Sequence, residues 1–325
     1  MKAIVMTGVG GPEVLVPREV PEPRPGAGDV VIRAAAIPVL FAETRLRSGE
    51  YPLPVEPPFL FGFQAVGTVT EVGADVDAGL IGQRVAMATM GFGAYAEYVC
   101  APATSVTPLP DGLSATDAAA VLMGGSVALT LLDTARLTGS ETVLIEAAAT
   151  GVGAALTQLA KNSGAARIIA TAGGPAKIAH ARKLGADEVI DHTDPSWPTH
   201  LHETLTSTTL DVVFDSIGGP TAAALLDTVT PLHGRILSYG FLSGTPAQIS
   251  AADLIPRGLT LTGCAGPHWL TRVAQSRPAA LNLAAAGTLI PQIDSILPLD
   301  EAATAHHLLE SRTPLGTVIL TPTQA

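Results

Sequence analysis

The pattern of hydrophobic and polar positions changes at about residue 119. Before this point, short stretches rich in β-branched residues, such as residues 30–33 and 67–72, are separated by Pro and Gly. This punctuation is typical of an irregular β domain, because Pro and Gly interrupt regular elements and favour turns. Beyond it, apolar stretches alternate with Ala-rich helical segments, which indicates a parallel sheet covered by helices on both faces.

Six strands are predicted in this second region. They cover residues 142–145, 168–171, 188–190, 211–215, 235–239 and 260–264. Strands that alternate with helices suit a doubly wound α/β sheet. A helix around residues 269–286 and a strand at 317–320 are expected to return to the first domain. The predicted organisation is 1–118 for the β domain, 119–264 for the α/β domain and 265–325 for the returning segment.

Length, cysteine content and charge narrow the class of protein. A chain of 325 residues is too long for one ordinary hydrophobic core, which agrees with two domains. The only two cysteines, Cys100 and Cys264, cannot build a disulfide framework or a four-thiolate zinc site. A net charge of -11 argues against a nucleic acid partner, since binding to phosphates needs arrays of Lys and Arg.

Membrane and secretory signals are not expected from the pattern. The longest uncharged apolar run lies between Asp117 and Asp133, short of the ~20 residues that span a bilayer, and it predicts a buried helix. The chain begins with the strand-like residues 2–6 rather than with a charged leader and an apolar block. We therefore expect a cytoplasmic protein with no membrane partner.

A turn that could bind a dinucleotide follows the first strand of the α/β region. The chain passes from residues 143–145 through a Gly-containing turn into a helical segment, an arrangement that directs free backbone N–H groups at a pyrophosphate. Against the G-x-G-x-x-G template only Gly153 is retained, because Ala148 and Thr150 occupy the first two glycine positions. A turn whose glycines serve only close packing is the alternative interpretation.

The distribution of charge around the second strand favours NADPH. Between Glu146 and Asp187 there is no acidic residue in a chain that carries 29 of them. The same window holds the basic residues Lys161, Arg167, Lys177, Arg182 and Lys183. An NAD site would need an acidic residue at the end of this strand for the ribose hydroxyls, so its absence indicates a 2'-phosphate. A solvated helix face is the alternative.

Several short segments beyond the turn carry a family resemblance. They are residues 47–52 (RSGEYP), 93–99 (GAYAEYV), 183–191 (KLGADEVID) and 211–215 (DVVFD). With the turn, they make essentially the whole chain resemble the quinone oxidoreductase branch of the medium-chain dehydrogenase/reductases. The resemblance implies a GroES-like β domain beside a Rossmann domain, a small-molecule substrate in the cleft between them, and usually a homodimer.

The resemblance also implies chemistry without a metal. Zinc-dependent relatives carry a Cys near the position of Leu40 and Gly-His-Glu where this chain has Gly62, Phe63 and Gln64. Leu and Phe cannot ligate zinc, so a Lewis acid that polarises an alcohol is not expected. What the resemblance then implies is hydride transfer from NADPH to the β-carbon of a quinone, an enone or an enoyl substrate.

Two residues are the candidates for catalysis. Tyr51 aligns with a Tyr that related enone and enoyl reductases carry just before Pro, and its phenol can donate to the enolate oxygen. Packing at the cleft edge is its alternative role. Glu43 could orient a substrate or act as a base, but pairing with Arg45 or Arg47 is the favoured interpretation. Tyr95 is expected in the core together with Tyr98.

Further candidates follow from the turn and the resemblance. Those for the cofactor, on the turn and near the ends of the following strands, are Ala149, Thr150, Gly151, Val152, Thr171, Gly173, Lys177, His192, Gly240 and Phe241. Those for the substrate pocket are Leu40, Gln64, Val127 and Trp269. Relatives usually have polar groups at the first three of these pocket positions, so a drier pocket is expected. The pair His306 and His307 has no third ligand at metal spacing and is interpreted as surface.

Three functions remain open at this level. The leading one is an NADPH-dependent reductase of activated C=C bonds. The second is a non-redox cyclase or isomerase on the same fold, which Leu40 and Val127 motivate because they replace polar groups of the usual pocket. The third is a binding or structural protein without enzymatic activity, which the basic window makes the least favoured.

Overall fold

The computed structural model describes residues 1–51, 53–88 and 92–322, which form two compact units. The first unit comprises Met1–Leu122, Leu281–Gly287 and the segment from Pro291, and the second comprises Met123–Ala280 and Thr288–Ile290. The chain changes unit within two helices, α2 (Ala115–Ala135) and α8 (Pro267–Ala285). The expected boundaries at 118/119 and 264/265 lie close to the starts of these helices, because the residue pattern changes where a helix begins.

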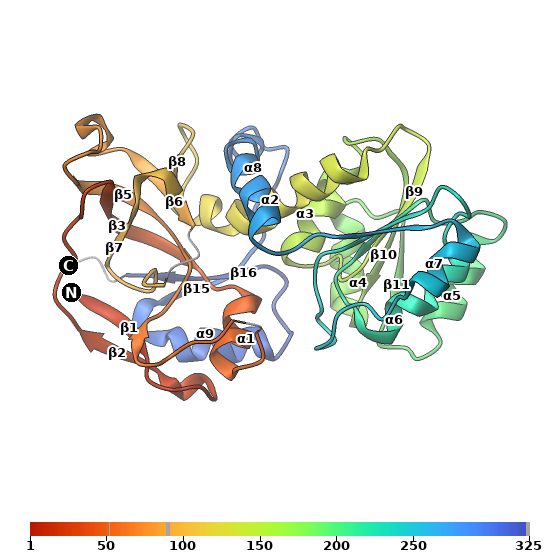
Figure 1. Ribbon diagram of the computed structural model, residues 1–325, viewed down its shortest axis with the longest axis horizontal. Coiled ribbons are helices and arrows are strands. Elements are labelled where there is room, and N and C mark those ends of the chain that lie inside the picture. Colours follow the sequence, from red (N-terminus) through yellow and green to blue (C-terminus); the bar gives the residue numbers. More distant parts are fainter. Residues whose placement is uncertain (52, 89–91, 323–325) are drawn as a thin grey trace. The chain divides into compact units, whose positions relative to one another are not determined.

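The second unit contains the predicted six-stranded parallel sheet (Figure 1). Its strands, in spatial order, are β11 (Glu188–Asp191), β10 (Ala165–Ala172), β9 (Glu141–Ile145), β12 (Val212–Asp215), β13 (Arg235–Ser238) and β14 (Thr260–Gly263). All five strand pairs are parallel. The first of these strands along the chain, β9, lies in the middle of the sheet, with β10 and β11 on one side and β12, β13 and β14 on the other, as in a Rossmann fold. The direction in which successive strands are added therefore reverses between β9 and β12. The predicted fold class is confirmed.

Helices cover this sheet, which explains the continuous apolar strands. Val143, Leu144 and Ile145 of β9 have no exposed surface, as expected for a strand buried on both faces. The helices of this unit are α3 (Gly151–Ala160), α4 (Gly174–Lys183), α5 (Trp197–Leu205), α6 (Gly219–Ala224) and α7 (Ala251–Leu254), with parts of α2 and α8. Parallel neighbours need such crossovers, because a short hairpin cannot join them.

The first unit is mostly antiparallel. A three-stranded sheet has the order β2 (Leu15–Glu19), β1 (Lys2–Met6), β4 (Phe59–Leu60). A larger sheet has the order β15 (Ile293–Pro298), β16 (Thr317–Thr321), β3 (Asp29–Pro38), β5 (Gln64–Val72), β6 (Arg84–Ala88), β8 (Val106–Pro108), and β7 (Tyr98–Pro102) pairs with β3. The helices α1 (Phe41–Ser48) and α9 (Ala302–Glu310) belong to this unit. The predicted returning strand is β16, and it joins β3 directly.

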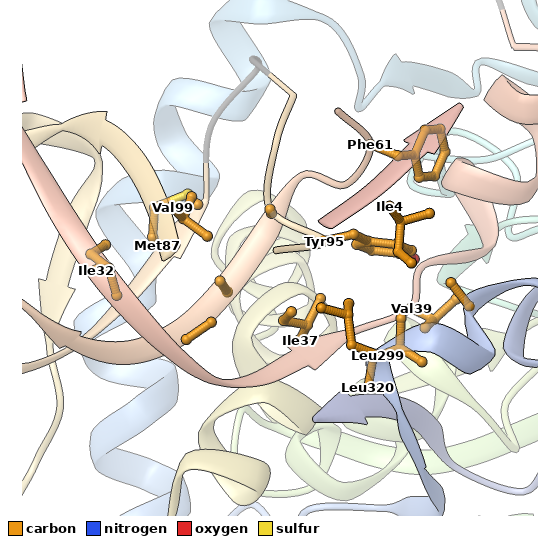
Figure 2. Packing of buried hydrophobic residues seen from close by; sticks show 14 of the residues in the cluster. Ile4, Ile32, Ile37, Val39, Phe61, Met87, Tyr95, Val99, Leu299 and Leu320 are labelled. Atoms are coloured by element: carbon orange, nitrogen blue, oxygen red, sulfur yellow. The ribbon is translucent and has the colours of Figure 1, made fainter. Parts of the chain in front are cut away.

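One hydrophobic cluster fills this first unit (Figure 2). Figure 2 shows Ile4 and Tyr95 close together near Phe61, with Leu299 and Leu320 from the C-terminal segment beside Val39. The rings of Phe61 and Tyr95 meet edge to face, with centroids 5.4 Å apart. Tyr95 has no exposed surface, which agrees with the prediction for it, whereas Tyr98 is only half-buried.

The apolar helix expected between residues 117 and 133 is α2, and it is longer than the uncharged run. It has 21 residues with a mean hydropathy of 1.6 over its most apolar window, enough by length and composition to cross a membrane. However, 61% of that window is buried inside the structure. This burial agrees with the prediction of a core helix.

A buried carboxylate fixes the start of β9. Glu141 is 6% exposed and accepts hydrogen bonds from the backbone N–H groups of Thr138, Gly139 and Ser140 and from the Thr138 hydroxyl. Arg235 contributes an ion pair at 3.3 Å. Burial acts to raise the pKa of Glu141, but the bonds from Thr138 and Ser140 outweigh it and lower this pKa to about 2.

Glu141→Gln should therefore destabilise the protein at pH 7 by roughly 2 to 3 kcal/mol. Because the pKa is depressed in the folded state, the stabilisation by Glu141 is complete above its unfolded pKa near 4.5 and is lost as the pH falls towards about 2. Urea unfolding at pH 7 and pH 3.5 measures this, with the exposed Glu203→Gln as the matched control. A difference between variant and wild type that does not shrink at the lower pH would contradict the assignment.

Candidate functional site

The turn between β9 and α3 presents an uncapped helix N-terminus. Thr150 is the N-cap residue, is extended, and makes no side-chain hydrogen bond to the first turn of α3. The backbone N–H groups of that turn have no intrahelical partners. Gly151 has φ 54°, and a Cβ atom built on it would meet nothing within 4 Å. These amides and the helix dipole fit a pyrophosphate, so Ala149, Thr150, Gly151 and Val152 have the geometry expected of cofactor residues.

The retained glycine of the motif is required by packing. A Cβ atom on Gly153 would lie 2.3 Å from the carbonyl oxygen of Ala147, so only glycine allows α3 this close to the turn. This is the role of the third glycine in a dinucleotide motif. A Cβ atom on Gly124 of α2 would likewise lie 3.0 Å from the carbonyl oxygen of Gly151. Close packing and an open phosphate cradle therefore occur in the same turn.

The end of β10 joins this turn through hydrogen bonds. The N–H of Ala147 donates to the Thr171 hydroxyl at 3.2 Å, and Nδ1 of His192 lies 3.2 Å from the same oxygen. A Cβ atom on Gly173 would be 3.0 Å from Nε2 of His192. The structure thus brings three further cofactor candidates, Thr171, Gly173 and His192, to the turn. Lys177 lies half-buried in α4, which begins at Gly174.

The charge environment differs from the one that the acid-free window predicted. Lys161 pairs with Asp187 at 2.7 Å, and Arg167 pairs with Glu188 at 2.9 Å. Arg167 also lies near the start of β10, whereas the adenine ribose meets the other end of this strand. Both partners stand just outside the window in sequence. Two of the five basic residues are therefore neutralised, and Lys177 lies in the first turn of α4, just after the end of β10.

An acidic residue that the window missed also lies at this end of the sheet. Asp191 ends β11 opposite Ala172 of β10. Its Oδ1 accepts hydrogen bonds from the N–H groups of Gly174 and Thr193 and from the Thr193 hydroxyl, which lower its pKa. The parallel register, rather than distance along the chain, brings this carboxylate beside β10.

Loops after β12 and β13 lie side by side at the same edge. The N–H of Tyr239 donates to the carbonyl of Asp215 at 2.9 Å, and the N–H of Leu242 donates to the carbonyl of Ser216 at 2.9 Å. A Cβ atom on Gly240 would lie 3.0 Å from the carbonyl oxygen of Ser216. The candidates Gly240 and Phe241 are therefore next to the point where the strand order reverses. Dinucleotides bind Rossmann folds at that point.

Two buried acids at this point were not among the predicted site residues. Glu146 is 1% exposed at the end of β9, and Asp215 has no exposed surface at the end of the neighbouring β12. Each stands at the carboxyl end of an apolar strand, which is the signal that could have identified them. Burial and the nearby Asp215 raise the pKa of Glu146 well above its ordinary value.

In the first unit, Glu43 lies at the centre of a buried network. It has no exposed surface and accepts hydrogen bonds from the N–H groups of Leu40 and Phe63, both at 2.8 Å, and from the Tyr95 hydroxyl at 2.7 Å. Burial raises the pKa of Glu43 to about 7 despite these three donors. Its carboxylate thus ties the start of α1 to the segment just before Gln64.

The predicted pairing of Glu43 with an arginine is wrong. Arg45 pairs with Glu50, and Arg47, which is 1% exposed, pairs with Glu310 of α9. Arg45 is two positions from Glu43 and so lies on another side of α1. Arg47 is one turn away, but Glu310 and the carbonyl of Gly10 bind its guanidinium. Glu43 instead faces the core of its unit.

The interpretation of His306 as a surface residue is also wrong, although His307 is exposed as expected. His306 has no exposed surface, and its Nε2 lies 3.2 Å from the Tyr95 hydroxyl. Its ring also meets Phe61 edge to face at 5.6 Å. Burial lowers the pKa of His306 to about 3, so it is neutral at physiological pH. The amphipathic helix α9 packs its inner face on the core, and adjacent residues of a helix face different sides.

The remaining pocket candidates divide between the two units. Leu40 is half-buried, and Gln64 is 1% exposed with its Oε1 lacking a hydrogen-bond partner. Tyr51 is half-buried and packs against the core of the first unit, and the Pro52 that follows it lies outside the described residues. In the second unit, Val127 is 9% exposed, and Trp269 is 8% exposed with Arg272 stacked 5.1 Å from its ring centre.

Among residues 1–51, 53–88 and 92–322, no group of three or more His, Cys, Asp or Glu side chains is arranged to hold a metal ion. The positions where zinc-dependent relatives carry ligands hold Leu40 and Phe63 here. Neither side chain can coordinate zinc.

Comparison with known proteins places this geometry in a family. Two family models match: the alcohol dehydrogenase GroES-like domain over residues 26–111 and the zinc-binding dehydrogenase over residues 151–285. A quinone oxidoreductase from Pseudomonas aeruginosa is 36% identical over 329 residues, covering 99% of each chain. A 2-haloacrylate reductase from a Burkholderia species is 34% identical, covering 98% of each chain.

Solved structures show the same relationship. The crystal structure of Escherichia coli quinone oxidoreductase complexed with NADPH has a TM-score of 0.91 and 31% sequence identity, and the match covers 99% of this chain and 100% of that one. The structure of a 2-haloacrylate reductase has a TM-score of 0.86 and 31% identity over 100% of both chains. The chain therefore belongs to the quinone oxidoreductase branch of the medium-chain dehydrogenase/reductases, a family of oxidoreductases.

Proposed function

We propose that this chain is an NADPH-dependent reductase of activated C=C bonds in small quinones, enones or enoyl compounds. The observation that carries the proposal is the uncapped turn of α3, whose open backbone amides and tightly packed Gly153 suit a dinucleotide. Relatives at 36% and 34% identity are named as a quinone oxidoreductase and a 2-haloacrylate reductase. Both names agree with reduction of an electrophilic unsaturated carbon.

The proposed cofactor residues surround the turn. Thr150, Gly151 and Val152 would hold the pyrophosphate through backbone amides, because no side chain caps them. Gly240 and Phe241 would contact the half of the cofactor beyond the β9–β12 boundary. Lys177 would meet the 2'-phosphate near the end of β10. When bound, NADPH supplies the hydride that is added to the β-carbon.

Tyr51 is the proposed hydrogen-bond donor to the substrate. Hydride addition at the β-carbon places negative charge on the substrate oxygen, and a phenol stabilises that charge by donating a hydrogen bond. Glu43 is proposed as a positioning residue rather than a base. Its carboxylate is completely buried and holds the backbone of Leu40 and Phe63, next to the proposed pocket residue Gln64.

Apolar replacements distinguish this pocket from the usual one. Leu40 and Val127, at positions where relatives usually carry polar groups, offer no hydrogen bond to a substrate, so we expect its orientation to depend on Tyr51 and on apolar contact. Such a pocket suits a substrate with one carbonyl oxygen and an apolar remainder. The cytoplasmic location is a prediction from the residue pattern, and the homodimer is a prediction from the resemblance.

The reaction itself is tested by mixing the protein with NADPH and a panel of quinones, enones and enoyl thioesters while following absorbance of the reduced nicotinamide. We expect consumption of NADPH with at least one class. Tight NADPH binding with no turnover across the panel would contradict the proposal and favour a non-redox cyclase or isomerase. A chain that binds no nucleotide would instead be a structural or binding protein.

Preference for the phosphorylated cofactor is tested at Lys177. NADPH should bind more tightly than NADH, and Lys177→Met should weaken NADPH roughly tenfold to hundredfold because a charge-assisted contact is lost. NADH affinity should not change. Fluorescence titration measures all four constants, and Lys183→Met, an exposed position in the last turn of α4, is the control. Equal affinities of the wild type for the two nucleotides would reject the assignment.

The role of Tyr51 is tested with Tyr51→Phe, which removes the hydroxyl and keeps the ring. Loss of one donor to a developing oxyanion should lower kcat by about 100-fold or more, with little change in NADPH affinity. Tyr98→Phe, at a half-buried position of β7, is the matched control. If kcat is unchanged in Tyr51→Phe, Tyr51 is a packing residue and another group donates the hydrogen bond.

A further inference from the structure

Two buried carboxyl groups stand at the carboxyl ends of adjacent strands in the second unit. Glu146 and Asp215 follow the paired residues Ile145 and Phe214 of the adjacent parallel strands β9 and β12. They are 1% and 0% exposed, and burial together with the neighbouring Asp215 raises the pKa of Glu146 well above its ordinary value. Two neighbouring carboxylates offer only acceptors, so a proton on one of them would let the pair form a hydrogen bond in place of a repulsion.

The surrounding donors indicate which group carries this proton. Asp215 accepts hydrogen bonds from the N–H of Gly218 at 2.8 Å and the hydroxyl of Ser238 at 2.7 Å, on different oxygens. Oε2 of Glu146 accepts from the N–H groups of Ser216 and Ile217, both at 3.2 Å. Asp215 thus has the donors that a carboxylate needs, and Glu146 has one oxygen left to carry a proton towards Asp215.

Other charges near the pair favour retention of the proton. Among the described residues, Asp215 is the one titratable group that acts on the pKa of Glu146, and Glu146 and Asp215 both raise the pKa of Tyr239, together with burial. The ring of His192 contacts the hydroxyl of Thr171. No arginine or lysine contributes to the pKa of Glu146. A second negative charge at this buried point would be uncompensated.

The pair holds two loops of the proposed cofactor site. Glu146 begins the turn that leads to α3, and its side chain binds the backbone of residues 216 and 217 after β12. Asp215 binds the backbone of Gly218 in the same loop. Gly218 and Gly219 have φ values of 68° and 60°, which glycine adopts without steric cost, so the loop can turn directly after Asp215. The two loops flank the point where the strand order reverses.

We propose that Glu146 and Asp215 share one proton and that this proton couples the shape of the dinucleotide crevice to pH. The inference rests on the proposed function, since the crevice is the proposed NADPH site. Glu146 acts as a positioning residue that donates its O–H to Asp215 and accepts two N–H groups from the following loop. A pyrophosphate adds negative charge above the pair, so the complex retains the proton more tightly than the free protein.

The expected consequence is an alkaline loss of affinity. As Glu146 ionises, the dissociation constant of NADPH should rise by up to about tenfold per pH unit, because one proton is linked to binding. NADH should show the same slope, since the pair does not face the 2'-phosphate. Titrations above pH 7 avoid the titration of that phosphate, whose second pKa is about 6.

Glu146→Gln is the test variant, because its amide can donate to Asp215 and accept from the loop but cannot titrate. It should bind NADPH at pH 7 within a few-fold of the wild type, with the alkaline slope abolished. Infrared difference spectra should show a carboxylic acid C=O band in the wild type at pH 8 that is missing in Glu146→Gln. Ser238→Ala, which keeps both acids and removes one donor to Asp215, should move the alkaline midpoint to higher pH.

The outcomes separate this inference from the proposed function. Absence of the acid band in the wild type would overturn the shared proton. Nucleotide binding with the same pH slope in the wild type, Glu146→Gln and Ser238→Ala would overturn the coupling alone. No binding of either nucleotide by the wild type would overturn the coupling together with the cofactor assignment.

Discussion

The contact between the carboxyl ends of β9 and β12 is the constraint on which the candidate cofactor site depends. β9 leads into the turn of α3, and β12 leads into the loop that contains Gly218. Glu146 joins the two by accepting N–H groups of Ser216 and Ile217. Since the dinucleotide of a Rossmann fold crosses this boundary, the relative position of the two loops determines whether both halves of the cofactor are held.

Residues further from the boundary support the same arrangement. Glu141 fixes where β9 begins through four hydrogen bonds from residues 138–140 and Thr138's hydroxyl, and Gly153 allows α3 to approach the carbonyl of Ala147. Thr171 then connects the end of β10 to the turn. Glu141 thus positions the strand, Thr171 positions the turn, and the missing side chain of Gly153 allows the position of the helix.

The sequence predicted the architecture well because its signals are local. All six strands of the second unit were located from their apolar runs, and their parallel order follows from the alternation with helices. The environment of individual charges was less predictable. Asp187, Glu188 and Asp191 lie outside the acid-free window, yet the register of β11 on β10 brings them beside it. Distance along the chain does not report such neighbours.

The first unit shows the same limit. Whether His306 or His307 faces the core depends on how α9 packs, and the pattern of two adjacent histidines does not reveal it. Glu43 aligns with an acid that relatives carry near the pocket. Its carboxylate is held by the backbone N–H groups of Leu40 and Phe63 and by the hydroxyl of Tyr95, and the residue pattern does not show these donors. The sequence therefore predicts an acid at position 43, but only the structure shows which groups it binds.

The central claim is that a hydride from NADPH is added to the β-carbon of an activated C=C bond. Its most direct measurement uses NADPH deuterated at the transferable position and an enone that the protein turns over, with the product analysed by NMR. The account predicts deuterium at the β-carbon and hydrogen from the solvent at the α-carbon. Deuterium at the carbonyl carbon, or a product formed without any transfer of deuterium, would contradict it.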